Sequence, residues 1–375
     1  MEGDGDNLSA GVGTGNRRPD ARSDAVSGIR ETIRAWWPAL KIALGLAVVV
    51  MVGSHFTEDL LDPRLWERPF RPGWVLLAAV LYLIGLFFSA LTWRRLLVHA
   101  GYRPPMLATA RAYYIGHLGK YLPGKAWALF LRAELLRGQG VSVGVGVVTA
   151  FYEVFITMTG AAAVAVVFFA AFAPTGSYRP GGQILRSLAV LRVPAELDVG
   201  RSTDVLLALG LLAIVGTPVL PPVFRAISER LARAFGAVDS VPHFRWRDLA
   251  PGLALTSTGW LFAGASLAAA VSAVIGPSAP WSLQLAGRTA AIMGVSYVAG
   301  FVVVFAPSGL GVREFFLALF LTPQLHEFGV PSQEARGLAI LAALVLRLAW
   351  TGAEIAAAAA LWWLRAGPAD AKPVS

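Results

Sequence analysis

The chain has 375 residues, of which 56% are hydrophobic and 15% charged, whereas a soluble domain carries about 25% charged residues. It has no cysteine and five scattered histidines, which excludes disulfides and thiolate nucleophiles and leaves no pair of residues at metal-ligand spacing. The net charge of +9 comes largely from cations beside apolar segments, a pattern typical of contact with lipid headgroups and not of nucleic-acid binding.

The order of polar and apolar segments predicts the domain organisation. Residues 1–35 are rich in Gly, Asp, Arg and Ser and predict a disordered cytoplasmic segment, residues 36–366 a transmembrane domain, and residues 367–375 a cytoplasmic tail. A bilayer core needs about 20 apolar residues in a helix, and these runs are too long for barrel strands, so we expect an all-α membrane protein. The candidate spans are Trp37–Phe56, Trp74–Trp93, Ser142–Ala173, Val205–Phe224, Leu249–Ile275, the shorter Thr289–Ala306, and Gly337–Leu364.

The distribution of Lys and Arg predicts the topology. Cations cluster before the first candidate span and after the last one, so both termini should be cytoplasmic. Seven full spans would place the termini on opposite sides. We therefore expect residues 285–322 to form two half-helices that enter from outside and break at Ala306–Gly311.

Residues 104–137 predict a second broken hairpin, which enters from the cytoplasm and breaks at Tyr121–Gly124. The two hairpins face opposite ways, which gives about six full spans and two re-entrant pairs in an inverted repeat, an arrangement of many transporters. The alternative is that residues 104–137 form only an interfacial loop. Apolar residues from Phe224 to Val238 recur at helical spacing between charges and predict a helix on the membrane surface.

Ionisable residues inside a bilayer are unfavourable, so each is a functional candidate. A proline–glycine break frees backbone amides, and the helix that follows favours an anion at its N-terminus. The predicted hinge residues are Pro123, Gly124, Pro307, Gly309 and Gly311, and the predicted substrate-binding cations are Lys120, Lys125, Arg132 and Arg313. The alternative for the first three cations is that they reach out to cytoplasmic headgroups.

Charge balance or coupling is predicted for Glu153, Glu314, Arg347 and Glu354. Glu153 could pair with a hairpin cation or carry a proton. Arg313 and Glu314 are adjacent and point about 100° apart on a helix, so we expect them to pair with other groups. Arg347 and Glu354 are treated as one pair. The alternative for these residues is a purely structural ion pair. No metal site or cofactor is predicted, and Lys125 is followed by Ala126, which excludes a phosphate-binding loop of the Gly-Lys-Ser/Thr type.

Two runs carry a family resemblance. The segment from Gly116 to Trp127 with Arg132, followed by Gly140-Val141-Ser142 and Glu153, resembles the first signature of the lysylphosphatidylglycerol synthase transmembrane-region family, which is also described as flippase-like. The segment Ala306–Glu314 resembles the second signature. The resemblance covers about residues 38–365 and implies paired re-entrant helices.

The resemblance also implies a function: in the best-known members this region moves aminoacylated phosphatidylglycerol to the outer leaflet, and a separate soluble half makes the lipid. We expect this chain to lack that synthase half and not to be an enzyme. We expect a lipid translocator of the cytoplasmic membrane, with a phosphate-headed lipid such as an aminoacylated phosphatidylglycerol or a lipid-linked sugar as cargo. The expected partners are membrane phospholipids or lipid-linked intermediates, a separate lipid-modifying enzyme, and a second copy in a homodimer. The alternatives are a membrane-embedded transferase acting on lipid-linked sugars and a non-transporting scaffold for an envelope-lipid enzyme.

Overall fold

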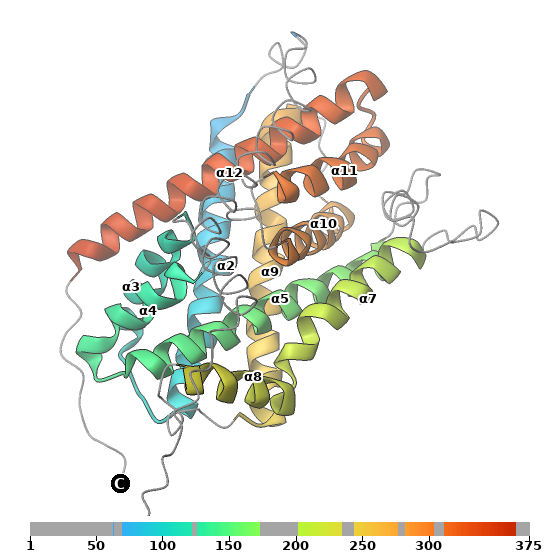
Figure 1. Ribbon diagram of the computed structural model, residues 1–375. Helices are drawn as coiled ribbons and strands as arrows, with labels where there is room; N and C mark the ends of the chain where they lie inside the picture. The colour runs from blue at the N-terminus through green and yellow to red at the C-terminus, as the bar shows by residue number, and fades with distance from the viewer. Residues whose placement is uncertain are drawn as a thin grey trace, which may run out of the picture. The chain divides into compact units, whose positions relative to one another are not determined.

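The computed structural model describes residues 70–121, 126–172, 202–234, 244–276, 282–303 and 311–364, together with Pro63. These residues form helices and no strand (Figure 1), which confirms the all-α fold. They lie in one compact unit, Gly45–Ser375. The first candidate span and the residues Pro123, Gly124, Lys125, Pro307 and Gly309 lie outside the described residues.

Five helices in the described ranges are long and apolar enough to cross a bilayer: α2 (Pro72–His99), α5 (Val143–Phe172), α9 (Trp246–Ile275), α10 (Leu283–Val302) and α12 (Ser332–Trp363). Four of them coincide with predicted spans. The helix α10 begins six residues before the predicted Thr289, and its 20 residues suffice for a crossing. A half-helix at this place is therefore not confirmed.

The predicted span Val205–Phe224 is not one straight helix. It is divided between α7 (Ser202–Gly216) and α8 (Pro221–Ala234), and the axis turns by 61° between them. Pro218, Pro221 and Pro222 cause the break, because proline lacks the amide that a continuing helix needs. The surface helix predicted from Phe224 onward is α8, but Phe224 is buried and stacks on Tyr152 with ring centroids 3.7 Å apart. This side chain therefore packs on protein.

Among the described helices, α2 and α9 share the most extensive contact, and they lie side by side in Figure 1. They run antiparallel, since Arg71 at the start of α2 donates its amide to Ala273 near the end of α9. They approach most closely at two glycines: a Cβ on Gly85 would lie 2.7 Å from the carbonyl oxygen of Gly259, and a Cβ on Gly259 would lie 2.7 Å from that of Gly85. The contact is thus reciprocal.

Two helix pairs pack around this central pair. In the first, α3 (Met106–His117) and a 3-10 turn, Leu118–Tyr121, precede α4 (Trp127–Leu135). These helices have 12 and 9 residues, too few to cross a bilayer. In the second pair, α10 precedes α11 (Val312–Glu327). The first pair contacts α5 and α12, and the second pair contacts the same two helices. This packing carries both predicted hairpins to a common site.

Candidate functional site

A cavity lies where the two helix pairs meet α2, α5, α9 and α12. Its empty space amounts to about 1390 Å³, including the part that is open to the surroundings. Much of the wall is apolar or aromatic, and four cations reach it: Lys120, Arg132, Arg313 and Arg347. The structure therefore brings together three of the four predicted substrate-binding cations, whereas Lys125 lies outside the described residues.

The first cluster in the cavity is centred on Glu153 of α5, whose side chain is 1% exposed. Its carboxylate accepts from Arg132 Nη1 at 2.9 Å, from Tyr113 Oη at 3.0 Å and from Thr157 Oγ1 at 2.7 Å. The Arg132 guanidinium also lies 3.8 Å from the centroid of the Tyr113 ring. The prediction that Glu153 pairs with a hairpin cation is confirmed by this contact.

The second cluster is centred on Glu354 of α12. Its carboxylate accepts from Lys120 Nζ and Tyr82 Oη, and from Tyr121 Oη at 2.8 Å. Arg347 and Glu354, the two charges predicted for this span, do not bind each other: each forms an ion pair with a residue of another element. These two residues are seven positions apart on one helix, and the partner that Glu354 meets comes from the turn after α3, far away in the sequence.

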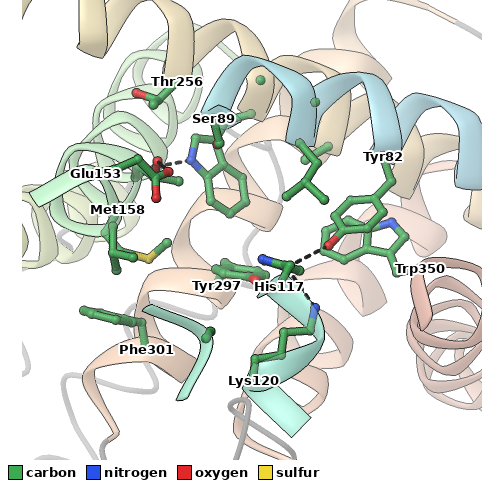
Figure 2. A pocket seen from close by; sticks show the side chains of 18 of the residues that line it. Tyr82, Ser89, His117, Lys120, Glu153, Met158, Thr256, Tyr297, Phe301 and Trp350 are labelled. Atoms are coloured by element: carbon green, nitrogen blue, oxygen red, sulfur yellow. Dashed lines mark hydrogen bonds between the residues drawn. The ribbon is translucent and has the colours of Figure 1, made fainter. Parts of the chain in front are cut away.

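His117 stands between the two clusters, as Figure 2 shows beside Lys120 and Tyr82. Its Nδ1 lies 2.9 Å from Arg132 Nη2, and its Nε2 lies 3.6 Å from Glu354 Oε1. Its Nε2 also lies 3.1 Å from Lys120 Nζ. A guanidinium and an ammonium can only donate, so each ring nitrogen of His117 faces a cation, and the imidazole links Arg132 of the first cluster to Lys120 of the second.

The third cluster is centred on Glu314 at the start of α11. Its Oε1 accepts from Arg347 Nη1 at 2.5 Å and from Arg313 Nη2 at 3.1 Å, and its Oε2 accepts from the Gly311 amide at 2.8 Å. The expectation that Arg313 and Glu314 do not pair with each other is wrong, because the long guanidinium side chain reaches the carboxylate of its neighbour. Gly311 has a φ of +83° and begins α11, which agrees with its predicted place at the break.

Aromatic residues complete the cavity and were not singled out by sequence reasoning. Tyr82 and Trp350 stack with ring centroids 3.9 Å apart. The Arg313 guanidinium lies 5.3 Å from the Trp350 ring and 5.5 Å from the Tyr297 ring. In Figure 2, Met158 and Phe301 lie on the side of Glu153, away from Lys120 and Tyr82. His117 and Tyr121 lie within the first signature, whereas Tyr82, Tyr297 and Trp350 lie outside both signatures, so no sequence signal marks these three.

The arrangement is suited to holding an anion in an apolar cavity. Four cations face three carboxylates among the described cavity residues, so the cations are in excess. In the described ranges, no group of three His, Cys, Asp or Glu could hold a metal ion. The site offers charge-assisted hydrogen bonds, which are stronger than neutral ones.

Comparison with known proteins identifies the family. The sequence model of the family described as lysylphosphatidylglycerol synthase TM region matches residues 39–351, which is most of the chain. A comparison with curated proteins finds no match. The match includes both helix pairs, the clusters around Glu153 and Glu314, and most of α12. With its apolar helices, the chain is a multi-pass membrane protein of the lysylphosphatidylglycerol synthase transmembrane-region family, whose members take part in lipid handling.

Proposed function

We propose that this protein is a lipid translocator that carries a phosphate-headed lipid between the leaflets of the cytoplasmic membrane. One observation supports this most: cations from both helix pairs, Arg132 of α4 and Arg313 of α11, line a single cavity within a bundle of apolar helices. A charged headgroup has a large free-energy barrier in lipid alone. A polar cavity inside the bundle lowers that barrier while the acyl tails stay in the bilayer.

We propose further that α2–α5 and α9–α12 are two inverted repeats. The reciprocal contact of Gly85 with Gly259 supports this, as does the antiparallel course of α2 and α9. A glycine with positive φ follows the first helix of each half, Gly101 and Gly276, and another precedes the last helix of each half, Gly140 and Gly329. In this arrangement the first hairpin enters from the cytoplasm and the second from outside.

The ion pairs suggest how the cavity could open to one side and then the other. Arg132–Glu153 lies within the first half, and Arg347–Glu314 within the second. Lys120–Glu354 joins the two halves. Movement of one half against the other would exchange this pair for contacts with the lipid head. The three carboxylates each hold cations, so we propose transport without chemical conversion of the lipid.

The test is translocation of a fluorescent phospholipid in proteoliposomes, read as loss of protection from dithionite. The variant Arg132→Gln/Glu153→Gln removes a whole buried pair, so that no charge is left without a partner. The matched control is Arg225→Gln/Glu229→Gln, which removes the exposed Arg–Glu pair of α8. We expect wild type and the α8 variant to translocate phosphatidylglycerol, and the cavity variant to fall to the protein-free rate. Translocation by the cavity variant at the wild-type rate would refute the proposal.

A further inference from the structure

Two buried guanidinium groups in the cavity each keep one nitrogen without a partner. Arg132 and Arg313 are 3% and 7% exposed, and both line the cavity. The Nε atoms of both residues are buried and make no hydrogen bond in the part of the chain that the structure describes. Buried donors are nearly always paired in folded proteins, so these two groups require an explanation.

The terminal nitrogens of each guanidinium have acceptors within the protein. Glu153 and His117 accept from the two Nη atoms of Arg132, and Glu314 accepts from Nη2 of Arg313. The carboxylates therefore fix the orientation of each fork and leave Nε–H for another acceptor. One arginine comes from each hairpin. An oxyanion that enters the cavity would supply the missing acceptors, and the phosphate of a phospholipid head is an oxyanion whose geometry a guanidinium matches.

Charge balance limits what else the lipid head can carry. The described carboxylates at the cavity, Glu153, Glu314 and Glu354, are all in ion pairs. The aromatic faces of Tyr113, Tyr297 and Trp350 already have arginines beside them. An ammonium group on the lipid would therefore find a cation already beside each of these three carboxylates and each of these three rings.

We propose that Nε–H of Arg132 and Nε–H of Arg313 bind one phosphodiester, and that the cavity selects lipid heads of net negative charge and rejects aminoacylated ones. This inference rests on the proposed function, because it assumes that a lipid head enters the cavity. A lysyl headgroup brings two ammonium groups against one phosphate and has a net positive charge. The excess of cations in the cavity would repel this positively charged head. Repulsion of a wrong ligand is one way in which a binding site achieves specificity.

The first experiment needs no variant. Purified wild-type protein in non-ionic detergent is titrated with three short-chain lipids: phosphatidylglycerol, phosphatidylcholine and lysyl-phosphatidylglycerol, whose heads are anionic, zwitterionic and cationic. All three heads offer the same phosphodiester, and each added cation meets the excess of cations in the cavity. We therefore expect phosphatidylcholine to bind about tenfold more weakly than phosphatidylglycerol, and the lysyl lipid more weakly still. Equal affinities, or tightest binding of the lysyl lipid, would overturn the proposal.

The second experiment tests the two nitrogens. Arg132→Lys and Arg313→Lys keep the charge beside Glu153 and Glu314 but remove Nε–H, so the ion pairs survive. Each should weaken phosphatidylglycerol binding about tenfold, and the double variant should lose much less than the product of the two, because both donors bind one phosphate. Losses that multiply would overturn the single-phosphate site. Arg288→Lys is the matched control, because Arg288 is 4% exposed and binds Glu327 and Gln324 away from the cavity lining.

The failure of this inference differs from the failure of the proposed function. Translocation that is equally fast for anionic and cationic heads would refute the charge selection while the translocator stands. Binding of phosphatidylglycerol that depends on both arginines, without any translocation, would refute the translocator while the phosphate site stands.

Discussion

The reciprocal glycine contact between α2 and α9 gives a prediction whose sign can be worked out from the structure. In Gly85→Ala, the added Cβ would lie 2.7 Å from the carbonyl oxygen of Gly259, on backbone that cannot turn away. Forcing the helices apart costs about 1–3 kcal/mol, which outweighs the gain of about 0.5–1 kcal/mol that alanine brings to a helix. We therefore expect net destabilisation of about 1–2 kcal/mol. Because the contact is reciprocal, Gly259→Ala should lose a similar amount.

The control is Gly210→Ala in α7, where a Cβ would meet nothing within 4 Å. This variant should gain about 0.5–1 kcal/mol from helix propensity alone. The free energy of unfolding is measured by reversible unfolding in mixed micelles, with thermal melting in detergent as a second readout. The opposite signs are the decisive result. If Gly85→Ala is as stable as Gly210→Ala, the close approach of α2 and α9 is refuted.

Two further predictions concern buried polar groups. In Glu354→Gln, Lys120 loses its counter-charge, so we expect the free energy of unfolding to fall by about 3 kcal/mol. The double variant Lys120→Met/Glu354→Gln should recover part of this loss. An unchanged melting temperature in Glu354→Gln would contradict the ion pair. In Tyr152→Phe, the carbonyl of Val219 loses a 2.7 Å hydrogen bond while the stack on Phe224 remains. We expect a loss of about 1 kcal/mol, measured by the same unfolding assay, and a wild-type stability would show that this bond does not hold the bend before α8.

Much of the architecture could be predicted because lipid imposes simple rules. Continuous apolar runs predicted α2, α5, α9 and α12, and the cost of a charge in a bilayer marked Lys120, Arg132 and Arg313 as functional candidates. The bend between α7 and α8 was within reach too, since Pro218, Pro221 and Pro222 stand inside the predicted span. The prediction of one straight span followed the apolar composition of this segment and disregarded its prolines.

The choice of partners could not be predicted. Arg347 and Glu354 stand two helical turns apart on α12, too far for a direct pair, and they bind Glu314 and Lys120. These pairings depend on how α11 and the turn after α3 pack against α12, a relation between distant segments. His117 lies within the segment from Gly116 to Trp127 and Tyr82 lies in neither signature, and no sequence pattern links either residue to Glu354. Their roles follow only from their distances to the carboxylate of Glu354.

The Lys120–Glu354 pair also has a consequence for how the protein is made. The chain is synthesised from its N-terminus, so the hairpin that carries Lys120 is complete more than 200 residues before Glu354 is added. An ionised side chain at the centre of an inserting helix is unfavourable by about 3 kcal/mol. By the time α12 leaves the ribosome, the lysine and the tyrosines that receive its carboxylate are already in place. Helix α12 thus inserts beside segments that already carry the partners of Glu354, and the first half of the protein assists the insertion of the second half.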